Sequence, residues 1–230
     1  DTGIKALDNL TFELEEGQTL GIIGKIGSGK STLAELLCRL IDPTSGSIKF
    51  GNDRLAALNL QQLRSHIGNV PQESFLFSDT IFNNIAFGHK NATELQVLDA
   101  AKSALIYDNI MTFKENFNTV VGERGITLSG GQKQRVSIAR AFIRNPKFLL
   151  FDDCLSAVDT ETEELILQNI KKQSVNKTTI IISHRASSLK HAHQIIVLDK
   201  GAIIEQGSHT ELLNLDGEYA SVYKKQITES

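Results

Sequence analysis

The stretch Gly21–Thr32, which reads GIIGKIGSGKST, constrains the fold of this chain more than any other segment. It contains the pattern G-x-x-x-x-G-K-[ST], formed by Gly24, Gly29, Lys30 and Ser31. An apolar run precedes the pattern and a helical pattern follows it, which predicts a strand, a loop and a helix in succession. Glycines let such a loop curl until its backbone N–H groups point inward, and the helix N-terminus adds the positive end of its dipole. The segment is therefore predicted to bind phosphate.

The residues of this loop have different expected roles. Lys30 would reach the β- and γ-phosphates of a nucleotide, and the Ser31 hydroxyl would ligate Mg²⁺. The predicted nucleotide-binding set is Gly24, Lys25, Ile26, Gly27, Ser28, Gly29, Lys30, Ser31 and Thr32. A plain glycine-rich turn is the alternative, but the pattern arises by chance in only about one chain in a hundred of this length.

A second segment, FLLFDDCLSAVDT at residues 148–160, supplies the carboxylate that such a loop needs. Asp152 directly follows the apolar run Phe148–Phe151, so its side chain is expected at the carboxyl edge of a sheet, where α/β proteins bind ligands. There it would hold the hydrated Mg²⁺. A lone aspartate after a strand is more often a helix cap, but the phosphate-binding loop favours the metal role.

Strand patterns alternate with helical patterns along the chain, which predicts an α/β fold with a largely parallel sheet. The predicted strands are Thr19–Ile23, Phe148–Phe151, Thr178–Ile182 and Gln194–Leu198. The predicted helices are Lys30–Leu40, Glu94–Leu105, Gln132–Arg144 and Glu161–Lys171, with Pro43 and Pro146 as stops after two of them. Residues 59–113 are expected to be mostly helical, without a central strand.

Composition excludes several classes of protein. The net charge of −3 is spread along the chain without a long run of one sign, which argues against a nucleic-acid partner. No stretch approaches the roughly 20 apolar residues of a membrane helix. The two cysteines, Cys38 and Cys154, are predicted to be reduced and buried. The chain begins with Asp1 and almost at once shows strand-like alternation at Leu10, Phe12 and Leu14, so we expect a fragment of a longer protein.

The segment Leu128–Ala141, LSGGQKQRVSIARA, decides among the families that share a phosphate-binding loop. It resembles the nucleotide-binding domain of ATP-binding cassette (ABC) transporters, whose signature is LSGGQ, and the resemblance covers nearly the whole chain. Ser129, Gly130 and Gly131 would open a helix with an exposed N-terminus, which is a second anion site. The resemblance adds the signature residues Leu128, Ser129, Gly130, Gly131 and Gln132 to the nucleotide-binding set.

The resemblance also implies a fold, cofactors and partners. The fold would be the P-loop ABC-ATPase fold over residues 1–230, with a mostly parallel sheet, an antiparallel β portion and a helical signature lobe at about 73–145. Two such domains would pair head to tail around ATP and Mg²⁺, as a homodimer or a heterodimer. The second partner would be the transmembrane domain of the same transporter, at the cytoplasmic face of the cell (inner) membrane. The strand that normally precedes residue 1 and carries an aromatic residue against adenine would be missing.

Three more residues match elements of the family. Gln72 in NVPQESFLF resembles the glutamine that contacts the metal and the attacking water and senses the membrane domain. Asp159 in SAVD resembles the loop that crosses the dimer interface, and the resemblance adds it to the nucleotide-binding set. His184 in IISHR resembles the histidine that contacts the γ-phosphate. Gln72, His184 and Asp153 form the predicted catalytic set.

Two segments, PQESFLFSDTIFNNIAFG and TVVGERG, resemble exporters rather than importers. In exporters the second segment, here Val121–Gly125, contacts loops of the partner subunit's membrane domain. A soluble ABC protein of DNA repair or chromosome structure is another class, but it would carry large insertions that are absent here.

Asp153 raises one more alternative, because most family members have glutamate at that position. Aspartate is shorter by one methylene and withdraws the carboxylate by about 1.5 Å. We therefore predict the degenerate-site half of a heterodimer, which lends its intact signature to a partner. The alternatives are a slow homodimer and a regulatory module with little or no turnover.

Overall fold

The computed structural model describes residues 5–89, 91–122, 125–155 and 158–229, and the chain divides into two compact units. Unit 1 consists of residues 1–67 and 178–230, and unit 2 of residues 68–177. Unit 1 is thus assembled from the two ends of the chain, whereas unit 2 is a single continuous segment.

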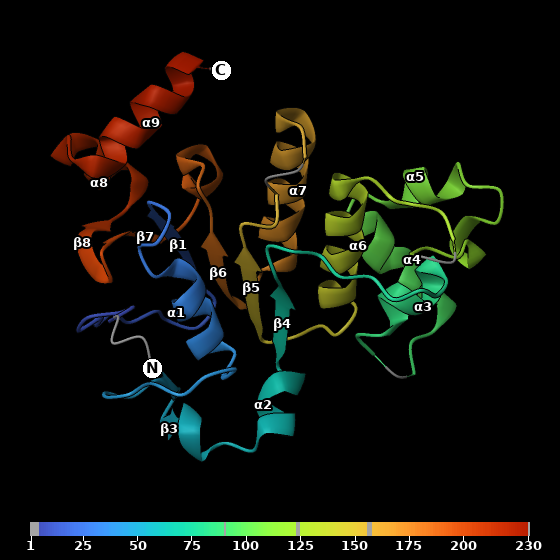
Figure 1. The fold of residues 1–230 in the computed structure, drawn as a ribbon, viewed down its shortest axis with the longest axis horizontal. Coiled ribbons are helices and arrows are strands. Elements are labelled where there is room, and N and C mark those ends of the chain that lie inside the picture. Colours follow the sequence, from blue (N-terminus) through green and yellow to red (C-terminus); the bar gives the residue numbers. More distant parts are fainter. Residues whose placement is uncertain (1–4, 90, 123–124, 156–157, 230) are drawn as a thin grey trace. The chain divides into compact units, whose positions relative to one another are not determined.

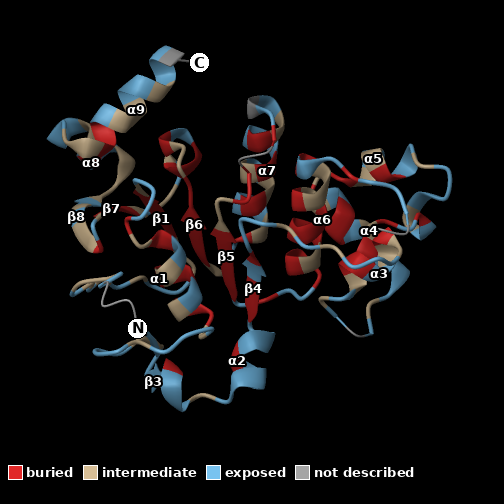
Figure 2. Cartoon of the chain, in the orientation of Figure 1, coloured by how far each residue is buried: buried red, intermediate tan, exposed pale blue. Residues whose placement is uncertain are grey.

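Unit 1 is built on four strands in the order β6-β1-β7-β8 (Figure 1). Their bounds are Thr19–Gly24 for β1, Thr178–Ile182 for β6, Gln194–Asp199 for β7 and Ala202–Gly207 for β8. Strand β1 pairs in parallel with both β6 and β7, and the middle residues of all three are buried (Figure 2). The three predicted strands of this unit are confirmed, and β1 and β7 each extend one residue further than predicted.

Strand β8 was not predicted, and it pairs antiparallel with β7. Two residues connect them, Lys200 with φ of 46° and Gly201 with φ of 82°. Positive φ at both central residues is typical of the two-residue hairpin turn whose twist matches that of the flanking strands. The Lys-Gly pair between two apolar runs was the available signal in the sequence.

The remaining elements of unit 1 are small. They are α1 Lys30–Leu37, β2 Lys49–Phe50, β3 Asp53–Arg54, α2 Leu60–Ser65, α8 His209–Leu215 and α9 Glu218–Glu229, with short 3₁₀ helices at Leu55–Ala57 and Ala186–Leu189. Strands β2 and β3 pair antiparallel, so the predicted antiparallel portion is present. The strand expected around Leu10, Phe12 and Leu14 is not present: the described residues 9–15 form no strand.

Unit 2 is mainly helical. Its helices are α3 Ile81–Ala86, α4 Glu94–Ser103, α5 Tyr107–Met111, α6 Gly130–Phe142 and α7 Thr160–Gln173, with a 3₁₀ helix at Asn116–Asn118. Strand β5, Phe148–Asp152, lies beside β4, Ile67–Val70, whose first residue belongs to unit 1. Helix α6 packs against α3 and α4 and is largely buried (Figure 2). The stretch 59–113 contains helices α2 to α5 as expected, and β4 is a short strand that this expectation left out.

Two predicted helices end early for the same reason. Helix α1 stops at Leu37 because Arg39 adopts a φ of 49°, and the Leu40 N–H then donates to the Glu35 carbonyl at 2.8 Å. Helix α4 stops at Ser103, where Leu105 with φ of 55° occupies the same position. This left-handed cap usually requires glycine, so its occurrence at arginine and leucine left no signal in the sequence.

Neither cysteine forms a disulfide within the described residues, and both are buried, as predicted. Burial raises the pKa of the Cys154 thiol, which disfavours the reactive thiolate. No helix in the described part of the chain is long and apolar enough to cross a membrane.

Candidate functional site

The predicted phosphate-binding loop runs from the end of β1 into α1 in unit 1. Gly29 caps α1 with φ of 103°, a conformation that glycine adopts without strain. A Cβ on Gly29 would lie 2.7 Å from the Ala6 carbonyl oxygen and 2.5 Å from a Leu7 methyl carbon. The segment before β1 therefore lies against the loop, a contact that the sequence did not indicate.

Lys30 is held by the backbone of the loop itself. Its side chain is 7% exposed, and its Nζ donates to the Gly24 carbonyl at 2.7 Å and to the Lys25 carbonyl at 2.9 Å. The loop thus curves around the ammonium group of its own lysine. This places a full positive charge at the N-terminal end of α1, where the helix dipole already favours anions.

The Ser28 hydroxyl fits a bound phosphate. Ser28 is 2% exposed, and within the described residues its Oγ is one of the buried side-chain atoms that find no hydrogen-bond partner. A buried unpaired hydroxyl costs free energy unless a ligand satisfies it. The adjoining Gly27 has open space where a Cβ would stand. Ser31 and Thr32 follow in the first turn of α1.

Among the glycines of the loop, Gly24 leaves the least room for a side chain. It pairs with Leu198 of β7, and a Cβ built on Gly24 would lie 2.3 Å from the Leu198 carbonyl oxygen. We expect Gly24→Ala to lower the free energy of unfolding by about 3 kcal/mol, the upper part of the usual range for overpacking. Urea denaturation measures this loss.

The matched control is Gly46→Ala, because Gly46 has φ of 83° but nothing within 4 Å of an added Cβ. Its free energy of unfolding should fall by only about 1 kcal/mol, the cost of placing alanine in the left-handed conformation. Equal losses for the two variants would show that the contact with Leu198 is not what requires glycine at position 24.

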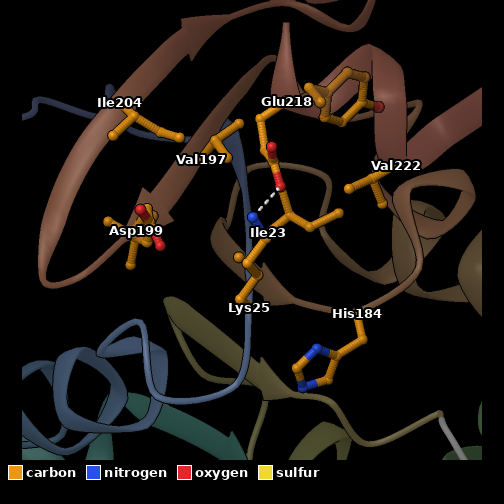
Figure 3. Close-up of a pocket in the computed structure, with 11 residues that line it drawn as sticks. Ile23, Lys25, His184, Val197, Asp199, Ile204, Glu218 and Val222 are labelled. Atoms are coloured by element: carbon orange, nitrogen blue, oxygen red, sulfur yellow. Dashed lines mark ion pairs between the residues drawn. The ribbon is translucent and has the colours of Figure 1, made fainter.

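Lys25 and His184 line one cavity of about 220 Å³ in unit 1, shown in Figure 3. Lys25 Nζ lies 2.9 Å from a carboxylate oxygen of Glu218, at the start of α9. The hydrogen bond to Glu218, and then its charge, raise the pKa of Lys25. His184 follows β6 and is half-buried. The structure therefore connects the phosphate-binding loop, the predicted histidine and the last helix.

Unit 2 brings Gln72 and Asp153 together. Gln72 lies two residues after β4 and Asp153 directly after β5, and Gln72 Nε2 is 3.5 Å from a carboxylate oxygen of Asp153. Asp152 is the last residue of β5, as expected from its place after the apolar run. Asp153 has φ of 43°, in the left-handed region that aspartate visits more readily than most residues.

The signature segment begins helix α6 with an exposed N-terminus. Ser129 caps the helix and, with Gln132, forms a capping box in which each side chain accepts from the other residue's backbone N–H. Ser129 and Gly130 are exposed, whereas Leu128 and Gly131 are buried. The helix starts two residues before the predicted Gln132 because this cap sets its first turn.

Asp159 caps helix α7 through its carboxylate, which accepts from the Thr162 N–H at 2.9 Å. This hydrogen bond lowers the pKa of Asp159. The preceding residues Ser156 and Ala157 of the predicted interface loop lie outside the described residues. So do Glu123 and Arg124 of the segment Val121–Gly125.

Arg140 of α6 organises the PQESFLFSDTIFNNIAFG segment. Its guanidinium donates to the Asn84 carbonyl at 2.8 Å, to the Asn84 side-chain oxygen at 3.0 Å and to the Phe75 carbonyl at 2.9 Å. Burial lowers the pKa of Arg140. Phe75, Phe77 and Phe87 gather beside it and remain partly exposed.

Comparison with known proteins identifies the family of this chain. Residues 7–156 match the family described as ABC transporter. The chain belongs to the ABC transporter family. This ABC domain is 45% identical over 230 residues to the ATM1-type heavy metal exporter of Novosphingobium aromaticivorans, covering all of the chain and 38% of that protein. It is also 45% identical over 229 residues to heavy metal tolerance factor 1 of Caenorhabditis elegans, covering all of the chain and 29% of that protein.

A solved structure supports the ABC-ATPase fold. The structure of a bacterial Atm1-family ABC exporter with ATP bound matches this ABC domain with a TM-score of 0.93 and 45% identity. The match covers 98% of the chain and 40% of that exporter. The chain thus spans between 29% and 40% of the length of these three matched proteins.

Sequence reasoning missed one part of this ABC domain's site, the C-terminal helix α9. Glu218 contacts the phosphate-binding loop, and Gln226 contacts the backbone on both sides of Arg185. No sequence motif indicates such contacts, because the residues in contact lie far apart in the sequence. The available signal was only the capping box of α8, formed by Ser208 and Glu211, which marks helices after β8.

Proposed function

We propose that this chain is the ATP-binding and ATP-hydrolysing motor domain of an ABC exporter. The observation that carries the proposal is the loop around Lys30, where an ammonium group and the buried Ser28 hydroxyl lie at a helix N-terminus. These groups suit the phosphates of ATP. Similarity to exporters along the whole chain supports the transport role rather than that of a soluble ABC protein.

The domain would act as a dimer that is paired head to tail. The exposed start of α6 at Ser129 and Gly130 is a second N-terminus suited to an anion, whereas one phosphate-binding loop already serves one nucleotide. A signature contributed by a second domain would complete each site. That second domain is either another copy of this chain or a related chain.

In the proposed reaction, water attacks the γ-phosphate of ATP in line with the leaving oxygen. Lys30 and the partner domain's signature residues would stabilise the charge on the phosphates. His184, Gln72 and Asp153 would orient the water, with a carboxylate accepting its proton. Mg²⁺ would be held by Ser31, Gln72 and Asp152, and when bound it neutralises charge on the β- and γ-phosphates.

The second proposed partner is a transmembrane domain, on the cytoplasmic side of a membrane. The exposed aromatic residues Phe75, Phe77 and Phe87 support this, since Phe75 and Phe87 are 66% and 65% exposed. Clustered exposed aromatic side chains mark surfaces that another protein covers. Because Arg140 holds the backbone of this segment, the aromatic cluster has a defined shape.

Asp153 favours a second candidate, in which this site hydrolyses ATP slowly as half of a heterodimer. The support for this candidate is the residue type at position 153, where most members of the family carry glutamate. Aspartate is one methylene shorter than glutamate, so its carboxylate would lie about 1.5 Å short of the position that a glutamate would reach.

We expect Asp153→Glu to raise kcat at this site by about 10-fold or more and to leave ATP affinity unchanged, because a misplacement of about 1 Å can cost about 10²-fold in rate. Single-turnover ATPase assays of the full-length protein, with any partner's own catalytic carboxylate disabled, measure this. Equal rates in parent and variant would remove the slow-site candidate. Absence of hydrolysis in both, with all sites intact, would overturn the motor proposal.

A further inference from the structure

One side chain of helix α9 holds the backbone of the loop that carries His184. Gln226 Nε2 donates to the His184 carbonyl at 2.7 Å, and Gln226 Oε1 accepts from the Ala186 N–H at 2.8 Å. Both ends of a single planar amide are thus used, and together they bracket Arg185. Two hydrogen bonds from one rigid group fix the position and the direction of this short backbone segment.

A cavity borders this loop on one side. His184 lines the cavity of about 220 Å³, together with Val222 and Tyr219 of α9 (Figure 3). The two hydrogen bonds from Gln226 are therefore contacts that hold the backbone of this loop beside the cavity.

Helix α9 is itself anchored on the sheet and on the phosphate-binding loop. The carboxylate of Glu205, in β8, accepts from the first two backbone N–H groups of the helix, those of Glu218 and Tyr219. A carboxylate at a helix N-terminus also stabilises the helix dipole. Glu218 in turn pairs with Lys25 at 2.9 Å, and Tyr219 is fully buried. The start of α9 is thus fixed beside the phosphate-binding loop, while Gln226 lies two turns further along.

We propose that Gln226 is a positioning residue for ATP hydrolysis, which acts by holding the His184 loop in register with the phosphate-binding loop. This inference rests on the proposed function, because it requires His184 to act on the γ-phosphate or the attacking water. Gln226 does not touch the nucleotide. It acts through the backbone of His184. The contact between Glu218 and Lys25 fixes the start of α9 beside the phosphate-binding loop, and the helix then holds Gln226 at a set distance from that loop.

The test is Gln226→Ala in the full-length protein. We expect kcat for ATP hydrolysis to fall about 10-fold or more, while KM and the affinity for ATP stay unchanged, because displacement of a catalytic group by about 1 Å can cost about 10²-fold. Lys224→Ala is the matched control on the same helix, because it removes only an exposed ion pair with Asp216. The control should retain the parent kcat.

A second variant separates hydrogen bonding from packing. Gln226→Met keeps the length of the side chain but can neither donate nor accept in the same way, and we expect the same loss in kcat as with alanine. If the melting temperature of Gln226→Ala shows that this variant does not fold, Gln226→Met tests the proposal in its place. Parent-like kcat in Gln226→Met would overturn the proposal.

Combination with His184→Ala distinguishes this inference from the proposed function. If Gln226 acts through His184, then adding Gln226→Ala to His184→Ala should lower kcat no further. Additive losses would show that Gln226 acts elsewhere and would overturn the inference alone. If His184→Ala by itself leaves kcat unchanged, the role proposed for His184 fails, and the role of Gln226 fails with it.

Discussion

Lys30→Ala is expected to abolish measurable ATP binding. The substitution removes the one full positive charge that the phosphate-binding loop directs inward, and it also removes the two hydrogen bonds that hold the Gly24 and Lys25 carbonyls around the ammonium group. A charge-assisted contact with a phosphate is about twice as strong as a neutral hydrogen bond, and no other described side chain of this loop is positioned to replace it. Titration calorimetry with ATP measures the loss directly.

Lys49→Ala is the control for this prediction, because Lys49 is an exposed lysine of strand β2. It changes the net charge by the same amount without touching the loop. The control should bind ATP as the parent does. Unchanged affinity in Lys30→Ala would show that the segment Gly21–Thr32 is not the nucleotide site.

Asp152→Asn is expected to weaken Mg²⁺-dependent nucleotide binding by about 10- to 100-fold, the usual effect of removing a residue that orients the ligands of a metal. Asparagine has the same shape as aspartate, so the change removes charge at the end of β5 while the strand itself stays intact. The measurement is ATP affinity with Mg²⁺ and with a chelator in its place.

The effect of Asp152→Asn should appear only in the presence of Mg²⁺. In the chelator, where phosphate contacts alone hold the nucleotide, parent and variant should bind ATP equally. Asp53→Asn, at an exposed position of β3, should match the parent in both conditions. A loss of affinity that is the same with and without Mg²⁺ would assign Asp152 a structural role.

The buried strands were the most predictable part of this fold. Strands β1, β6 and β7 each contain a run of apolar residues, and burial on both faces leaves that pattern in the sequence. The helix ends were less predictable. Arg39 and Leu105 end α1 and α4 in a conformation that is usually reserved for glycine, and the energetic cost of this is met by tertiary contacts that a local pattern does not contain.

The residues of the candidate site also differ in how well the sequence predicts them. Lys30, Asp152 and the start of α6 follow from local motifs, since a loop, a strand end or a helix cap defines each of them. Gln226 could not be predicted, because its role depends on contacts with residues 40 and 42 positions away in the sequence. Motifs indicate the groups that meet the ligand, whereas the residues that hold those groups emerge only from the folded chain.

The backbone at Asp153 limits how this site can be adjusted. With its left-handed φ of 43°, Asp153 makes a corner in the two-residue segment between the buried Phe151 and Cys154 side chains, which are 1% and 2% exposed. Both flanks of the corner are held by the core, so the main chain cannot slide forward to compensate for a short side chain. The distance of the carboxylate from the main chain then depends only on the number of methylenes in the side chain. A substitution can change this distance only in steps of one carbon–carbon bond.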